Sequence, residues 1–255
     1  PVTAWLVLDV SGRVVGEKLT QLRGAGEAFL SRLKDSDRAA LLTFSHEVRL
    51  RTTTEAAPSA VRAALASTQA GGATALNDAV YAAATLADPR VGRPVLVVFS
   101  DGQDTLSVLP PEAVRLVVRE SDLVVYGVTL PPDPFRGGVN RLAYLTDSRA
   151  DRRGAGNDRY GMTAPADDMA RIKRVAKDEP SLLRDLAEDS GGRVWNAAGG
   201  NQLQDAFTRV VEEVKSRYVL RYEPRGVAKT GWHNLQVRLK TGKAEVRARR
   251  GYESR

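Results

Sequence analysis

The chain alternates between short, wholly apolar segments and longer segments with helical periodicity. The expected strand 4–9, up to its final Asp9, and the expected strand 94–99 are apolar at successive positions, as strands of a parallel sheet are when helices cover both faces. Residues 16–33 carry apolar side chains at helical spacing, and Gly26 on that face is expected to let the helix approach the sheet closely. Such alternation predicts an α/β fold with a doubly wound, mostly parallel sheet.

The expected strands are 4–9, 38–45, 47–52, 94–99, 122–130 and 193–196, and the expected helices are 16–33, 57–69, 75–87, 111–120, 180–189 and 202–216. The segment 47–52 follows a tight turn and is predicted to be an antiparallel edge strand.

Two parts of the chain depart from this alternation. Residues 131–178 are rich in Pro, Gly and mixed charge, and are predicted to be a long inserted loop with a short helix near 167–175. Residues 218–255 alternate apolar and polar side chains, which predicts an antiparallel β-hairpin extension. Its main strands are expected at 232–239 and 243–250, with the turn at Thr241-Gly242. The α/β domain is therefore expected to span 1–217, with the extension packed on or beside it.

Composition excludes several classes of function. The 255 residues carry a net charge of +7 and no cysteine, so disulfides, thiolate chemistry and cysteine-ligated metals are ruled out. The basic residues are spread among acidic ones, which argues against a nucleic-acid partner. No apolar run approaches the roughly 20 residues of a membrane span. Because the chain lacks an initiator Met and starts close to its first strand, we expect a processed product or a piece of a longer protein.

Polar side chains gather where the predicted strands end. Asp9 and Ser11 follow the first strand, Thr74 lies in a glycine-rich loop, and Asp101 follows the strand at 94–99. In open α/β sheets, binding sites form at the carboxyl ends of the strands, near the point where the strand order reverses. Two carboxylates and two hydroxyls from three loops suit a hard cation such as Mg²⁺, with Mn²⁺ or Ca²⁺ as alternatives.

Arg13 conflicts with such a site because arginine has no acceptor atom and stays protonated. A guanidinium about 5 Å from a divalent ion would be repelled by about 6–7 kcal/mol at an effective dielectric constant near 20. Two arrangements are therefore open. Arg13 swings outward and leaves a weakened metal site, or it pairs with Asp9 or Asp101, replaces the charge of the ion, and no metal binds.

These motifs resemble the von Willebrand factor A (VWA) family. Its metal-ion-dependent adhesion site (MIDAS) reads Asp-x-Ser-x-Ser, with a Thr and an Asp from two further loops. The matching residues are Asp9, Ser11, Thr74 and Asp101, and Arg13 stands in place of the second Ser. The resemblance implies a VWA/Rossmann-like fold.

The later part of the chain is similar to a bacterial VWA-related subfamily with a C-terminal β extension. The similarity rests on 183–193, on 216–222 and on the ending Arg249-Arg250-Gly251-Tyr252. Members of that subfamily are generally exported, so the resemblance implies a periplasmic or extracellular protein.

By this resemblance the chain is expected to be an interaction or adhesion module rather than an enzyme. It would bind an acidic group of a protein partner at the strand C-terminal face, with Arg13 and Asp104 as partner-binding residues. Asp104 can also be explained as a cap of the segment that follows it.

Two alternatives remain. One is a structural assembly module whose metal site is lost. The other is a Mg²⁺-dependent phosphohydrolase of the haloacid dehalogenase type, but such enzymes need an acid/base two residues after the nucleophile, where this chain has Ser11.

Overall fold

The computed structural model describes residues 1–90, 92–130, 182–197, 200–220, 222–226, 230–243 and 245–254. The chain divides into two compact units, one formed by 1–130 with 181–255 and the other by 131–180. The inserted loop expected at 131–178 and its short helix at 167–175 lie outside the described residues.

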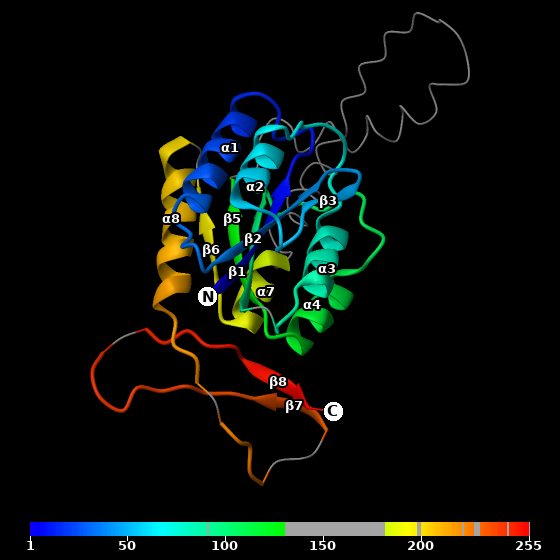
Figure 1. Ribbon diagram of the computed structural model, residues 1–255. Coiled ribbons are helices and arrows are strands. Elements are labelled where there is room, and N and C mark those ends of the chain that lie inside the picture. The colour runs from blue at the N-terminus through cyan, green and yellow to red at the C-terminus, as the bar shows by residue number, and fades with distance from the viewer. Residues whose placement is uncertain are drawn as a thin grey trace, which may run out of the picture. The chain divides into compact units, whose positions relative to one another are not determined.

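A six-stranded sheet forms the centre of the described unit (Figure 1). Its strands run in the order β3-β2-β1-β4-β5-β6, and only the edge pair β2–β3 is antiparallel. The strands are β1 (Val2–Asp9), β2 (Arg38–Phe44), β3 (Val48–Thr52), β4 (Arg93–Ser100), β5 (Val124–Thr129) and β6 (Arg193–Asn196). The predicted doubly wound sheet with one antiparallel edge strand is confirmed.

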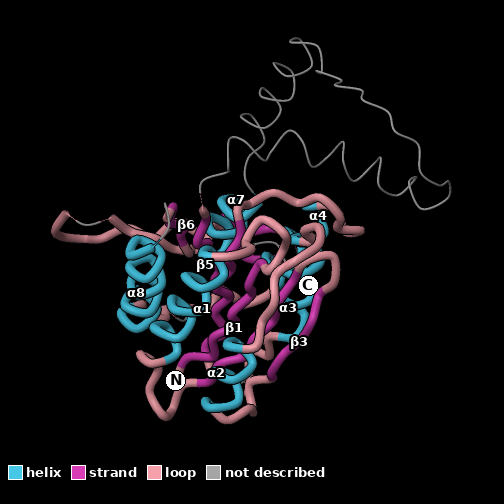
Figure 2. Tube along the Cα trace, turned by 90° about the horizontal axis from the view of Figure 1, so that it is seen from above, coloured by secondary structure: helices cyan, strands magenta, loops and turns pink. Residues whose placement is uncertain are grey.

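Helices cover both faces of this sheet, as Figure 2 shows from above. The helices are α1 (Glu17–Leu30), α2 (Pro58–Ala66), α3 (Leu76–Leu86), α4 (Pro111–Glu120), α7 (Leu182–Ser190) and α8 (Gly200–Ser216). The apolar side chains of α1, α2 and α8 pack on one face, and those of α3, α4 and α7 pack on the other.

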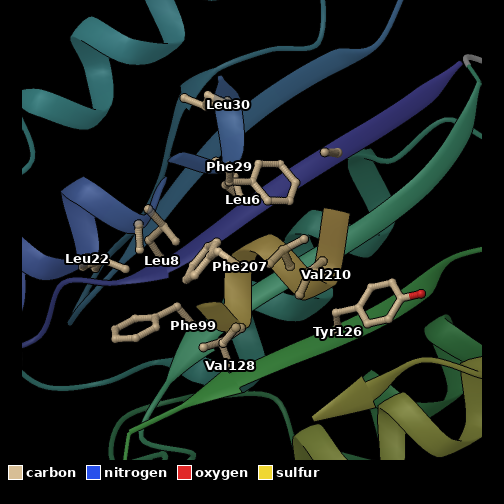
Figure 3. Close-up of a cluster of buried hydrophobic side chains, with 14 of the residues drawn as sticks. Leu6, Leu8, Leu22, Phe29, Leu30, Phe99, Tyr126, Val128, Phe207 and Val210 are labelled. Carbon is tan, nitrogen blue, oxygen red and sulfur yellow. The ribbon is translucent and has the colours of Figure 1, made fainter. Parts of the chain in front are cut away.

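The pleat of β1 explains why its sequence has no polar face. Leu6 and Leu8 point into the core beneath α1, α2 and α8, whereas Trp5 and Val7 point into the core beneath α3, α4 and α7. Phe207 of α8 fills the centre of the first core (Figure 3). β1 is thereby fixed from both sides, which holds its carboxyl end in place.

Gly26 serves a different contact from the one expected. A Cβ atom at Gly26 would lie 2.8 Å from Cδ2 of Leu65 on α2, and the nearest neighbours are all atoms of Leu65. The glycine therefore allows α1 to approach α2 rather than the sheet.

The C-terminal extension forms a second sheet of two antiparallel strands, β7 (Gly231–Asn234) and β8 (Gly251–Ser254). The antiparallel extension is confirmed, but the expected long hairpin with its turn at 241–242 is wrong. Described residues between the two strands form no ladder, apart from one bond from Leu235 N to Arg250 O.

Residues just before β8 contact the α/β unit instead of pairing with 235–239. A Cβ atom at Gly191 would lie 2.6 Å from the backbone of Ala248, and Arg249 donates hydrogen bonds to the carbonyls of Arg119 and Ser121. These tertiary contacts replace the local hairpin that the alternating pattern predicts.

Candidate functional site

The site lies where the strand order reverses. From β1 the chain passes to β2 on one side, and it later returns to β4 on the other side. Asp9 is the last residue of β1 and Ser100 the last residue of β4, and Ser100 Oγ donates a hydrogen bond of 3.0 Å to Asp9 Oδ2. This is the topological switch point at which α/β sheets bind ligands.

Asp9 is a buried carboxylate, with 1% of its surface exposed. Its Oδ1 accepts a hydrogen bond of 2.8 Å from the amide of Ser11. The pKa of Asp9 is raised to about 6, chiefly by burial; the negative charge of Asp101 also raises it, whereas interactions with Ser11 and Ser100 lower it. Asp9 therefore carries its charge at neutral pH at a cost in stability.

The Ser11 hydroxyl is buried and has no hydrogen-bond partner among the described residues. It lies near enough to Asp9 to help lower the pKa of that carboxyl, but its geometry falls short of a hydrogen bond. A buried hydroxyl without a partner costs about 1–3 kcal/mol. The Ser11 hydroxyl is therefore an oxygen donor to which the described residues make no hydrogen bond.

Backbone hydrogen bonds join the loop after β1 to the glycine-rich loop before α3. Gly71 N donates to Val10 O at 2.8 Å, and Gly12 N donates to Gly72 O at 2.9 Å. Gly72 has φ +84°, and a Cβ atom there would lie 2.2 Å from Nδ1 of His46. Only glycine fits this position, and the two backbone hydrogen bonds hold the loop beside Val10 and Gly12.

Thr74 joins the glycine-rich loop to the loop after β4. Its amide donates to Thr105 Oγ1 at 3.0 Å, and its carbonyl accepts from the amide of Thr105 at 2.9 Å. Thr74 itself is buried. The fold thus brings together the three loops from which the sequence predicts a site.

Arg13 pairs with Asp101. Its Nη1 lies 2.9 Å from Oδ2 and 3.2 Å from Oδ1 of Asp101, and the two side chains are 22% and 14% exposed. The amide of Gln103 also donates to Asp101 Oδ1. Of the arrangements left open by the sequence, the structure has the ion pair with Asp101. Arg13 Nε and Nη2 make no hydrogen bond within the described part of the chain.

The donor set does not fit a divalent cation while Arg13 occupies this position. The orphaned Ser11 hydroxyl and the buried Asp9 carboxylate are oxygen donors that an ion such as Mg²⁺ accepts. However, the carboxylate of Asp101 is taken by a fixed positive charge, which repels a second cation. Among the described residues, no group of three or more His, Cys, Asp or Glu is placed to hold a metal.

Asp104 acts as a cap. Its carboxylate accepts hydrogen bonds from the amides of Asn77 at 2.8 Å, Ser107 at 3.0 Å and Leu106 at 3.2 Å, and from the Ser107 hydroxyl. Asp104 therefore caps backbone amides at two places, in the first turn of α3 and in the turn that follows Asp104 itself. Its partner-binding role stays a prediction.

We expect Asp104→Ala to lower the free energy of unfolding by about 1–2 kcal/mol, since it removes a cap at two places. Urea denaturation measures the change. Asp35→Ala, at an exposed aspartate after α1, is the control and should change stability by less than about 0.5 kcal/mol. Equal effects of the two substitutions would contradict the capping function.

Ser100 is the site residue to which the sequence assigned no role. Its hydroxyl donates to Asp9 and accepts a hydrogen bond from the amide of Gly102. Its place as the last residue of β4, directly before Asp101, was the available signal.

Together, the sheet and the loops at its strand ends define an α/β domain of the doubly wound class. Residues 4–103, which include Asp9, Ser11, Thr74 and Asp101, match the model of the von Willebrand factor type A domain family. The predicted resemblance to VWA domains is confirmed by this match and by the fold. A search of curated proteins found no significant match.

Solved structures with a similar fold have low sequence identity to this chain. A von Willebrand factor type A protein from Catenulispora acidiphila is 14% identical with a TM-score of 0.58, covering 85% of this chain and 43% of that one. An aerotolerance-related membrane protein from Bacteroides fragilis is 16% identical with a TM-score of 0.55, covering 85% and 100%. Proximal thread matrix protein 1 from the mussel byssus, with a zinc-occupied MIDAS motif, is 14% identical with a TM-score of 0.57, covering 84% and 45%.

Proposed function

We propose that this chain is a protein-interaction module that binds an acidic group of a partner beside Arg13, at the strand C-terminal face. VWA domains commonly mediate protein interactions and are generally not enzymes. The observation that carries the proposal is the orientation of the Arg13 guanidinium, which is half of a salt bridge and still has unused donors.

Arg13 can bind a second carboxylate without leaving the first. Both hydrogen bonds to Asp101 come from Nη1, which leaves the edge formed by Nε and Nη2. That edge has the spacing for a bidentate pair with a carboxylate. Asp101 positions the guanidinium, so less side-chain entropy is lost when a partner binds.

The phosphohydrolase alternative is disfavoured by the state of Asp9. A nucleophilic carboxylate must be reachable by substrate, but Asp9 is 1% exposed and both of its oxygens accept hydrogen bonds. Ser11 stands where the acid/base would be needed and cannot do that proton transfer at neutral pH. The assembly module remains the competing function, since it needs no ligand at Arg13.

We also propose that the protein acts after export. One structure with the same fold is a membrane protein by its name. Within the described residues, no helix is long and apolar enough to span a membrane.

The test is a selection from a phage-displayed random peptide library with this chain as bait. We expect the enriched peptides to contain Asp or Glu, and their amide versions to bind at least about tenfold more weakly, because a charge-assisted pair is lost. Fluorescence anisotropy with synthetic peptides measures the affinities. Arg13→Gln should weaken binding by a similar factor. Asp101→Ala should weaken it less, since the guanidinium remains but loses its anchor.

Arg32→Gln is the control for overall charge. Arg32 is exposed and follows the C-terminal end of α1, whereas Arg13 precedes the N-terminal end of that helix. It should leave peptide affinity unchanged. Unchanged binding in both Arg13→Gln and Asp101→Ala would overturn the proposal and favour the assembly module.

A further inference from the structure

We propose that Arg13 is a built-in substitute for the divalent cation, so that this site captures an acidic group without a metal. The inference rests on the proposed function, because it concerns how the same site attracts its ligand. It makes a claim about the unliganded chain that can be tested with metal ions alone.

The first argument is the position of the positive charge. Arg13 follows Asp9 and Ser11 at the next alternate residue of the same loop, and its Nη1 reaches across to the carboxylate after β4. The distances of 2.9 and 3.2 Å show one nitrogen shared between both Asp101 oxygens. The Arg13 side chain therefore ties the loop after β1, from which it extends, to the loop after β4, and an ion coordinated by both loops would join the same two loops.

The second argument is the state of the other oxygen donors. Ser11 Oγ is buried and orphaned, and Asp9 is buried with hydrogen bonds but no cationic partner within the described residues. These groups keep the arrangement of an oxygen-lined site although the Ser11 hydroxyl makes no hydrogen bond among the described residues. The residue that departs from such a site is Arg13.

The third argument is the local charge. Asp9 and Asp101 are carboxylates from neighbouring strand ends, and Arg13 supplies one positive charge through its ion pair with Asp101. Replacing Arg13 by serine would leave two carboxylates near each other together with three hydroxyl groups, from Ser11, Thr74 and the new serine. A divalent cation has the charge and the ligand preference to bind such a set.

The experiment follows thermal unfolding of the whole chain in EDTA, in 10 mM MgCl₂ and in 10 mM MnCl₂, with NaCl matching the ionic strength. For the wild type we expect metal to shift the midpoint by less than about 1 °C. For Arg13→Ser we expect an upward shift of about 3–5 °C, which is what a ligand at about ten times its Kd gives for a domain of this size. Isothermal titration with MnCl₂ measures the affinity directly.

Two control variants make the result specific. Arg13→Lys keeps the positive charge and should show no metal shift. Arg13→Ser combined with Asp101→Ala removes one carboxylate and should lose the shift of the single variant. The melt in EDTA shows whether each variant is folded before metal is added.

A wild-type shift as large as that of Arg13→Ser would overturn the inference, because Arg13 would then leave room for the ion. A folded Arg13→Ser variant that binds neither Mg²⁺ nor Mn²⁺ would overturn it as well. If Arg13→Ser does not fold, titration of the wild type with MnCl₂ tests the inference instead. Metal binding by the wild type would contradict the inference, and no binding in millimolar MnCl₂ would support it. None of these measurements uses a peptide, so a result that contradicts this inference is distinct from a result that contradicts the proposed function.

Discussion

Asp9→Asn is expected to stabilise the protein at neutral pH and to leave its stability nearly unchanged in mild acid. Asp9 is 1% exposed and has a pKa of about 6, against an ordinary value of 3.8. A difference of that size corresponds to about 3 kcal/mol of folding free energy. The carboxylate that the fold places at the switch point is therefore a cost, as is common for functional sites.

The sign follows from the direction of the pKa change. The pKa is higher in the folded state, so the folded state holds the proton more tightly than the unfolded state. The contribution to stability is fully present below pH 3.8 and is lost as the pH rises through 6. Above pH 7 the wild type bears the whole cost of the buried charge, whereas the asparagine variant has no charge to bury.

Urea denaturation of both proteins at pH 4 and at pH 7.5 measures the effect. We expect the stability difference between Asp9→Asn and the wild type to grow by about 2–3 kcal/mol between these two pH values. Asp205→Asn, at an exposed position of α8, changes the charge equally and is the control. If the stability difference between the variant and the wild type were the same at both pH values, the pKa of Asp9 would not be raised in the folded protein.

Asp189→Ala is expected to destabilise the protein by about 2–4 kcal/mol. Asp189 lies near the end of α7 with 1% of its side chain exposed, and its Oδ2 accepts from Arg115 at 3.0 Å and from Arg119 at 2.9 Å. Arg250 of the extension lies 3.9 Å from Oδ1. Removing one member of a buried ion pair costs about 3–5 kcal/mol, and we lower this figure because the two α4 arginines are 30% and 36% exposed.

Asp185→Ala is the matched control for this cluster. Asp185 is on the same helix and, among the described residues, pairs with Arg115 alone, at 3.2 Å, with 23% of its side chain exposed. We expect its loss to cost about 1 kcal/mol or less in urea denaturation. If the two alanine variants are equally stable, the arginine cluster does not hold α4 to α7 as the structure indicates.

The sequence predicted the strands and helices well because burial in this fold leaves a strong pattern. β1 and β4 are covered on both faces, so residues 4–8 and 94–99 are continuously apolar, and polar residues begin at Asp9 and Ser100. The prediction from sequence failed at 235–250, where apolar and polar residues alternate just as regularly. There, contacts of Ala248 and Arg249 with the α/β unit take the place of cross-strand pairs, and no local pattern encodes such distant contacts.

For the candidate site, the sequence by itself determined which polar residues follow the strands and that Arg13 is incompatible with ligating a metal. Chain order and residue chemistry are local properties, so Asp9, Ser11, Thr74 and Asp101 could be named without coordinates. Only the tertiary structure decided that Arg13 pairs with Asp101 rather than Asp9, that Ser100 supports Asp9, and that the Ser11 hydroxyl has no partner in the described chain. These depend on rotamers and on the approach of β1 to β4, which packing across the sheet sets.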